Sequence, residues 1–586
     1  MNQSSSSLLV SLLAVNFHRI LPACDAFSSP IRLTIGRSNR FERHSSGIFL
    51  KDGWIVGPRQ QSKLHAQHIQ HFGAHNTSDG VDIMTRPPAL PKGRSDQEIF
   101  EFIEEASDLY YLDTLIIGAG PAGIGVAHAL LRGGLDPSQI VLVDKARALG
   151  SSFRDWHNTT RFISPSWAGY PFGVQDLNAI VPDTSVSATQ QHPTGEEYAA
   201  YLETMMENTN LSCLFGETVI SIERRNEQNC FIVQTRNDQK EGDCVFIANY
   251  IVWAGGEWNS PRVPQIFDNK DACVHYKHAN IPQLLQSRRS PTDPIVLVGG
   301  GEAGADLGVA LAQKGAQVVI VEESEDDGEV TDPSRKLAPI TVERLANMGD
   351  KIEFRAGTKC TNVQRQGDLV TIVLESSSEE TGETITTGAN AVLCTGFDPS
   401  GNPLLKDLFE WNKEGLPMVT PENDESTVTR NLFLAGPSLM HQLACKDDNK
   451  EEKTDEEDDD DSKNIIFCFV YKYRTRFAVV SSAIIQLYLE DQTKKLQALL
   501  STPVEEMDEN IDDEEDLLSA DQIEELLIKK KNMQSYYRSK GFLITDLSCA
   551  QLACGMTGND APQYDSLDAS CCVSGEENEA AECKTC

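Results

Sequence analysis

The sequence predicts an α/β fold that contains two Rossmann-like dinucleotide-binding domains and ends in an acidic, cysteine-rich C-terminal tail. Three observations predict this fold: two glycine-rich GxGxxG turns, an apolar run before each turn, and a helix of small residues after each turn. The turns begin at Gly118 and Gly299. Because two dinucleotides bound in one chain can exchange electrons, the pair of turns makes redox chemistry the leading hypothesis.

Length and charge limit the classes of function. The chain has 586 residues, more than one core usually holds, so two or three domains with tails are expected. The formal net charge of -37 at pH 7 argues against nucleic acid or an anionic membrane surface as a partner of the whole molecule. Many of the aspartate and glutamate residues lie in two blocks, 447–461 and 505–525, and such blocks are typical of solvated segments. The alternative for these blocks is a docking site for a basic partner, with binding that weakens as salt rises.

The N-terminal segment is interpreted as a targeting sequence. An apolar run at 8–15 is too short to span a bilayer, and small residues at 24–26 offer a cleavage site, which together predict a signal peptide over 1–26. Residues 27–105 are predicted to be a Ser- and Arg-rich transit peptide and linker. The Ala26-Phe27 junction resembles the bipartite presequence of algae with secondary plastids. The expected location is therefore a plastid reached through the secretory pathway, and the ER lumen, secretion or a disordered leader are the alternatives.

The first glycine turn has a complete strand, turn and helix context. Residues 114–117 are predicted to be a strand, 122–131 a helix, and 139–143 a second strand that ends at an acid. Glycines there permit a tight turn, close approach of the backbone to a pyrophosphate and close packing of the helix, and the acid binds a ribose hydroxyl. The predicted cofactor-binding residues of this unit are Gly118, Gly120, Pro121, Ala122, Gly123, Asp144 and Lys145.

The second glycine turn opens a similar unit, which resembles a nicotinamide-cofactor module. Residues 295–298 and 317–321 are predicted to be strands, and 305–313 a helix. An acid after the second strand favours a ribose 2′-hydroxyl over a 2′-phosphate, so NADH is favoured, whereas Arg335 and Lys336 leave NADPH open. The predicted binding residues of this unit are Gly299, Gly301, Glu302, Ala303, Gly304 and Glu322.

The order of motifs resembles that of FAD/NAD(P)-dependent oxidoreductases with two dinucleotide-binding domains, in particular the flavin monooxygenase-like branch. Landmarks beyond the two turns are the strand end at 252–256, the segment Cys394-Thr395-Gly396-Phe397, which is similar to the family's ATGF crossing, and Ala435-Gly436-Pro437. The resemblance covers residues 112–489 and implies that the first turn binds FAD and the second binds NADH or NADPH. It also implies that the nicotinamide domain is inserted within the FAD domain. Pro437 stands where the family often has an acid that holds the ribityl chain.

The resemblance extends to a segment after the second strand. Residues 150–156 are similar to the family's GGxW segment, which reaches along the flavin, although Ser151 and Phe153 replace its second glycine and its tryptophan. Core filling is the alternative for Trp156. The resemblance therefore adds Ser152, Phe153, Trp156, Thr395, Gly396 and Gly436 to the expected cofactor-binding residues.

The motif order gives the expected domain boundaries. They are a signal peptide at 1–26, a transit peptide and linker at 27–105, the FAD-binding domain at 106–290 and 391–500 with an acidic insertion at 446–461, the NAD(P)-binding domain at 291–390, and the acidic, cysteine-containing tail at 501–586.

Two helices are predicted after the last landmark. Residues 465–489 are mainly apolar but carry Lys472, Arg474 and Arg476, which predicts a buried helix and no membrane span. In the family this helix directs its N-terminus at the flavin, where Lys472 or Arg474 would stabilise the reduced ring. Pairing of these cations with the acidic insertion is the alternative. Residues 520–537 are predicted to form an amphipathic helix on the surface or against a partner.

The resemblance implies hydride transfer from nicotinamide to flavin, followed by monooxygenase-like oxygen activation on an unknown small organic substrate. The fingerprint FxGxxxHxxx[FY] of class B flavin monooxygenases is matched only in part at 267–278, where Phe267 and His275 are present but the glycine is absent. The sequence therefore assigns no catalytic residue, and it assigns no metal ligand.

Cysteines near the C-terminus keep other functions open. They are Cys549, Cys554, Cys571, Cys572, Cys583 and Cys586. A thiol/disulfide oxidoreductase with a redox-active tail and a redox protein partner, a zinc site, and a disulfide staple are the alternatives for them. Neither nucleotide domain carries a CxxC beside its glycine turn, which argues against a classical dithiol reductase. A flavoprotein redox sensor or scaffold is the hypothesis from a different class.

Overall fold

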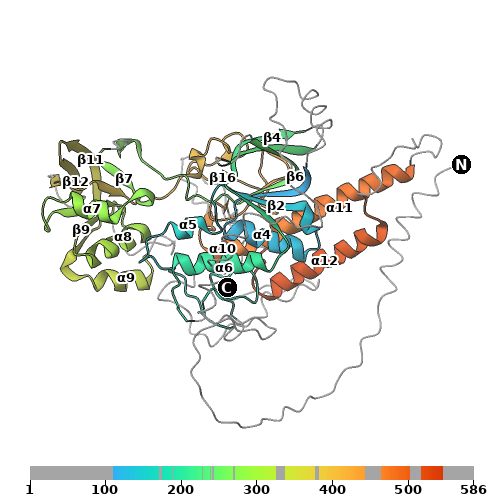
Figure 1. Ribbon diagram of the computed structural model, residues 1–586, viewed down its shortest axis with the longest axis horizontal. Helices are drawn as coiled ribbons and strands as arrows, with labels where there is room; N and C mark the ends of the chain where they lie inside the picture. The colour runs from blue at the N-terminus through green and yellow to red at the C-terminus, as the bar shows by residue number, and fades with distance from the viewer. Residues whose placement is uncertain are drawn as a thin grey trace, which may run out of the picture. The chain divides into compact units, whose positions relative to one another are not determined.

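The computed structural model describes residues 110–545, apart from 170–173, 188, 227–228, 238, 240–242, 268–270, 325–336, 377–381, 443–463 and 502–516. Two larger sheets form its framework (Figure 1). One strand of each sheet leads directly into one of the glycine turns. The targeting segment, the whole acidic insertion, Arg335, Lys336 and the C-terminal cysteines lie outside the described residues.

The first sheet has the strand order β3-β2-β1-β6-β5-β4, and β17 also pairs with β6. Strands β1, β2, β3, β6 and β17 are parallel to one another, whereas β5 pairs antiparallel with β6 and β4 pairs antiparallel with β5. Since β17 follows the second sheet in the chain, the second domain is inserted within the first, as predicted. The strands are β1 (Tyr110–Ile117), β2 (Ile140–Asp144), β3 (Ser212–Phe215), β4 (Thr218–Arg225), β5 (Cys230–Arg236), β6 (Asp243–Trp253) and β17 (Leu432–Leu434).

Helices cover this sheet. They are α4 (Pro121–Arg132), α5 (Ser151–Arg154), α6 (Gly195–Glu207), α10 (Val470–Tyr473), α11 (Phe477–Ser501) and α12 (Ala520–Ser539). Helices α4 and α11 approach closely because Gly125 leaves room for the Phe477 ring, whose nearest atom would lie 2.0 Å from a Cβ at that glycine. No helix of the described part of the chain is long and apolar enough to cross a membrane.

The range 501–586, expected to be a tail, contains a helix that belongs to the fold. Helices α11 and α12 lie side by side (Figure 1). Leu526, Met533 and Tyr537 of α12 are buried in the same core as β1 and β2, and Phe542 beyond the helix is also buried. Their spacing places these apolar side chains on one face of the helix, which therefore packs on the first domain.

The second sheet is parallel throughout and has the order β10-β9-β8-β14-β7. Its strands are β7 (Cys273–His275), β8 (Pro294–Val298), β9 (Gln317–Val321), β10 (Ile352–Arg355) and β14 (Ala391–Leu393). Helices α7 (Ile281–Ser287), α8 (Glu302–Gln313) and α9 (Pro339–Ala346) accompany it. Because β7 and β14 belong to it, this sheet draws on residues on both sides of the expected range 291–390.

Smaller elements complete the described fold. Strands β11 (Thr358–Gln366), β12 (Leu369–Ser376) and β13 (Glu383–Thr387) form an antiparallel sheet beside the second domain. Two-stranded pairs are formed by β15 (Glu410–Trp411) with β16 (Pro417–Met418) and by β18 (Met440–Gln442) with β19 (Asn464–Ile466). The 3₁₀ turns are η1 (Pro137–Gln139), η3 (Gln265–Phe267), η4 (Tyr276–His278), η6 (Gly349–Lys351), η7 (Pro399–Gly401) and η8 (Arg474–Arg476).

A buried ionic cluster secures the chain before α11. Asp424 is fully buried and receives hydrogen bonds from Arg476 at 2.7 Å and 2.9 Å, and its carboxylate lies 2.8 Å from His441 Nε2. The same guanidinium donates to the carbonyl oxygen of Ile544 at 2.9 Å, which ties the segment after α12 to this cluster. The Arg476 guanidinium and His441 keep the pKa of the Asp424 carboxyl below its usual value despite burial.

Candidate functional site

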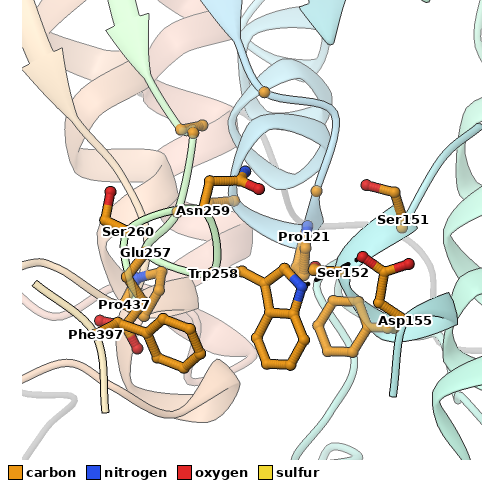
Figure 2. Close-up of a pocket in the computed structure, with 18 of the residues that line it drawn as sticks. Pro121, Ser151, Ser152, Asp155, Glu257, Trp258, Asn259, Ser260, Phe397 and Pro437 are labelled. Atoms are coloured by element: carbon orange, nitrogen blue, oxygen red, sulfur yellow. Dashed lines mark hydrogen bonds between the residues drawn. The ribbon is translucent and has the colours of Figure 1, made fainter. Parts of the chain in front are cut away.

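A cavity of about 950 Å³ is lined by the first glycine turn and by the start of α8. Its wall is built from the first glycine turn, the end of β2, α5, the turn after β6, the starts of α8 and α9, and the segment before α11. This volume is near the upper end for small-molecule pockets, as a dinucleotide requires. Figure 2 shows part of this wall.

The first glycine turn is shaped by backbone contacts that exclude side chains. Gly118 has φ +111°, and a Cβ on it would lie 2.3 Å from the carbonyl oxygen of Ala254. A Cβ on Gly123 would lie 1.9 Å from the Gly118 carbonyl oxygen, so helix and strand pack directly on each other. Gly120 differs, because a Cβ there would meet no atom within 4 Å, and the residue lines the cavity as the N-cap of α4. The N-terminus of α4 therefore opens onto free space, where its amides and dipole attract an anion.

Asp144 joins the strand end to this turn. Its carboxylate accepts hydrogen bonds from the backbone N–H groups of Ala119 and Ala146, both at 2.8 Å. Burial raises the pKa of the Asp144 carboxyl, and the two amides oppose this shift. Asp144 and its neighbour Lys145 line the cavity together with Pro121 and Ala122, whereas Gly123 lies behind the wall.

The second glycine turn repeats this geometry. Gly299 has φ +109° and would place a Cβ 2.4 Å from the Cys394 carbonyl oxygen, and Gly304 would place one 2.0 Å from the Gly299 carbonyl oxygen. Gly301, the N-cap of α8, has no atom within 4 Å of its Cβ position. Glu302 and Ala303 line the cavity, whereas the glycines of this turn do not.

Two acids fix the backbone around the second turn. The Glu322 carboxylate, at the end of β9, accepts the Gly300 N–H at 2.6 Å and lies outside the cavity wall. The Glu302 carboxylate accepts the Ala338 N–H at 2.5 Å and the Thr341 hydroxyl at 2.6 Å, which ties α8 to the start of α9. Burial raises the pKa of the Glu302 carboxyl.

Residues of the GGxW-like segment line the cavity, and their aromatic rings also pack against the core of the first domain. Ser152, Phe153 and Trp156 line the cavity. The Phe153 ring lies 5.1 Å from that of Trp156 and 4.6 Å from that of Tyr198, between ring centres, so the aromatic wall is held by packing.

The later landmarks contribute less directly than the resemblance implies. Thr395 donates its hydroxyl to the Arg262 carbonyl oxygen, and neither it nor Gly396 lines the cavity, but the next residue, Phe397, does. Gly436, at φ +117°, also lies behind the wall, and Pro437 forms part of it.

The turn after β6 supplies wall residues that sequence reasoning missed. Figure 2 shows the Trp258 indole pointing toward Asp155, to which its Nε1 donates at 3.4 Å. The Trp258 ring also lies 5.1 Å from the Phe397 ring. Burial raises the pKa of the neighbouring Glu257 carboxyl, and Arg262 opposes this shift. The signal that could have found this turn is the polar and aromatic run directly after the strand-end glycines.

The cavity wall also contains a residue with a buried hydrogen-bond acceptor that has no partner among the described residues. Asn178 is 1% exposed and donates its side-chain amide to the Ser164 carbonyl oxygen and the Ser166 hydroxyl, at 2.8 Å and 2.9 Å. Its Oδ1 has no partner among the described residues, and Asn178 lines the cavity. A buried acceptor normally has a donor. The two open helix N-termini and the Asp144 carboxylate along one cavity fit an elongated dinucleotide.

The cations expected to face the flavin are used elsewhere in the fold. Arg474 donates to the carbonyl oxygens of Asp176 and Ala179, and its guanidinium lies 4.0 Å from the centre of the Phe542 ring. Burial lowers the pKa of Arg474 to about 10. Lys472 is buried, with its ammonium 5.3 Å from the Phe469 ring. Neither side chain lines the cavity, so the expectation that one of them stabilises the reduced ring is wrong for this arrangement.

His275, the histidine of the partly matched fingerprint, is structural, and so is Cys394 of the landmark at 394–397. His275 is buried, and its Nε2 lies 2.9 Å from the Gly396 carbonyl oxygen, while burial lowers its pKa. Cys394 lies beneath the second glycine turn, and burial raises the pKa of its thiol to about 12. Cys468 lines the cavity.

Comparison with known proteins agrees with this geometry. A family model described as pyridine nucleotide-disulphide oxidoreductase matches residues 115–436, more than half of the chain. An uncharacterised oxidoreductase CzcO of Bacillus velezensis is 25% identical over 206 residues, which cover 34% of this chain and 52% of the relative. A ferredoxin–NADP reductase of Ignicoccus hospitalis is 24% identical over 327 residues, which cover 55% of this chain and 89% of the relative. The FAD-binding monooxygenase ausB of Penicillium brasilianum is 27% identical over 227 residues, which cover 35% of this chain and 34% of the relative. The chain thus spans about half the length of the CzcO relative.

Proposed function

Since the chain belongs to the pyridine nucleotide-disulphide oxidoreductase family, we propose that it is an FAD-dependent oxidoreductase that takes a hydride from NADH or NADPH. The observation that carries this proposal is the pair of open helix N-termini, at Gly120 and Gly301, next to one shared cavity. Bound FAD would supply the redox chemistry by accepting an electron pair from the nicotinamide and passing it on.

The residues of this chain would bind and orient the cofactors. The amides at the start of α4 would hold the FAD pyrophosphate, and Asp144 would accept a ribose hydroxyl. The aromatic wall formed by Phe153 and Trp156 would limit water near the reacting atoms. The start of α8 would place the nicotinamide cofactor on the other side of the cavity.

For the oxidative step we place monooxygenation first. In this reaction NADH, a proton, oxygen and an organic substrate give NAD⁺, the hydroxylated substrate and water, so electrons and atoms balance. Two observations support it: the similarity to the FAD-binding monooxygenase ausB, and the aromatic rings of Trp258 and Phe397, which give the cavity an apolar wall for an organic substrate.

Stopped-flow spectroscopy of the purified, FAD-loaded protein tests both steps. We expect NADH to bleach the flavin absorbance under anaerobic conditions. On mixing with oxygen, absorbance is expected to return in two phases, with hydrogen peroxide released only in the second. Single-phase return with immediate peroxide release would contradict monooxygenation, and a protein that binds no flavin would overturn the whole proposal.

The charges around the second turn favour NADH as the donor. Glu322 presents a carboxylate at the strand end, and two cations of the adjoining strands are already paired with acids: Arg355 with Glu353 and Glu383 at 2.8 Å and 2.6 Å, and Lys359 with Glu323 at 2.6 Å. A 2′-phosphate would therefore meet negative charge. A ribose 2′-hydroxyl would meet an acceptor.

Replacing Glu322 by serine is expected to reduce the preference for NADH over NADPH by about tenfold, or ~1.4 kcal/mol. The measurement is the ratio of kcat/KM for flavin reduction by the two cofactors. Glu323→Gln is the comparison variant: it releases Lys359 from its ion pair but leaves the Glu322 contact with the Gly300 N–H in place, so it is expected to change the ratio less than Glu322→Ser does. An unchanged ratio in Glu322→Ser would show that Glu322 does not select the cofactor.

A further inference from the structure

A buried polar cluster connects the two domains outside the chain segments that link them. Asp306 lies one turn into α8 and is 5% exposed. One carboxylate oxygen accepts the hydroxyl of Thr160, and the other lies 2.7 Å from the guanidinium of Arg344, in α9. The same guanidinium donates to the carbonyl oxygen of Thr159 at 3.1 Å. Asp306 thus holds a hydroxyl from one domain and a guanidinium from the other.

Residues 157–160, which we call the docking segment, belong to the first domain. Residues 161 and 162, which follow it, pair with the segment just before α6. The Phe162 N–H donates to the Pro193 carbonyl oxygen at 2.9 Å, and the backbones of Arg161 and Thr194 form an antiparallel β-bridge. At its other end, the His157 ring contacts Tyr276 of the second domain edge to face, with 5.6 Å between ring centres. The docking segment therefore contacts α8, α9 and η4 of the second domain.

The cluster lies on the wall of the cofactor cavity. Thr160, Asp306 and Arg344 all line it, as do Glu302 at the start of α8 and Arg161 beside the docking segment. Asp306 is a buried ion, so loss of either the Thr160 hydroxyl or the Arg344 guanidinium is costly. Loss of the Thr160 hydroxyl would leave one Asp306 oxygen without its donor and free α8 to shift relative to the first glycine turn.

We propose that the docking segment sets the spacing of the two glycine turns, and that Thr160, acting through Asp306, is a positioning residue for hydride transfer. This inference rests on the proposed function. In that step the hydride leaves the nicotinamide with its electron pair and is accepted by the flavin, and Thr160 exchanges neither proton nor electron. A displacement of about 1 Å can slow such a step by roughly a hundredfold.

The test compares Thr160→Val with Thr159→Val in the FAD-loaded protein. Both remove one hydroxyl at neighbouring positions, but the Thr159 hydroxyl has no partner among the described residues, and its carbonyl contact with Arg344 is retained. We expect Thr160→Val to lower the limiting rate constant of anaerobic flavin reduction by NADH at least about tenfold. FAD affinity is expected to stay within about twofold in both variants, and Thr160→Ser is expected to restore the rate. Equal rates in the two valine variants would overturn the proposal.

A second measurement separates this proposal from the proposed function. Hydrogen exchange of α8, in protein with FAD but without a nicotinamide cofactor, is expected to be faster in Thr160→Val than in Thr159→Val. If NADH fails to reduce even the unaltered protein, the proposed function is wrong, while the exchange result still reports on docking. Unchanged exchange in Thr160→Val, or a rate loss matched by an equal loss of FAD affinity, would show that Thr160 is merely structural.

Discussion

Replacing Gly120 by valine is expected to give a folded protein that no longer retains FAD. The backbone at Gly120 has φ −89° and ψ −170°, an extended conformation that valine adopts readily. Its Cβ would meet no atom within 4 Å, so the new side chain starts in open space. The new side chain would instead fill the space in front of α4, where the pyrophosphate is proposed to bind. We expect FAD affinity to fall at least about a hundredfold, or ~2.7 kcal/mol.

The flavin absorbance per polypeptide after purification measures this loss, together with FAD titration of the apoprotein. The unfolding temperature of the FAD-free variant is expected to match that of the FAD-free parent. Gly118→Val is the contrasting variant, since a Cβ at that glycine lies 2.3 Å from the Ala254 carbonyl oxygen and the backbone must move. If Gly120→Val purifies with its full complement of flavin, the first turn is not the FAD site.

The nucleotide-binding framework could be predicted because it depends on local patterns. Strands buried on both faces are continuous apolar runs, so 114–117, 139–143, 295–298 and 317–321 were recognisable in the sequence and correspond to β1, β2, β8 and β9. The glycines mark where the backbone leaves no room for a Cβ, as at Gly123, and this requirement is also local. The order of the motifs then predicted the insertion of one domain within the other.

The rest depends on contacts between residues distant in the sequence. Strands β7 and β14 have three residues each, too few for a periodic pattern, and their place is set by pairing across the sheet. Thr160 and Asp306 are ordinary polar residues until the fold brings them together, 146 positions apart. Arg474 was expected to interact with the flavin because its actual partners, the backbone carbonyl oxygens of Asp176 and Ala179, cannot be predicted from the sequence.

Replacing Gly301 by valine is expected to leave FAD bound and to prevent its rapid reduction by NADH. Gly301 is the N-cap of α8 with φ −68° and ψ −173°, and its Cβ also meets no atom within 4 Å, so the substitution matches Gly120→Val in chemistry and geometry. We expect kcat/KM for anaerobic reduction by NADH to fall at least about a hundredfold, while dithionite reduces the flavin at the parental rate. Because the two variants differ only in which helix N-terminus is blocked, opposite effects on FAD retention would assign one cofactor to each turn. Loss of flavin from Gly301→Val, or reduction by NADH at the parental rate, would contradict that assignment.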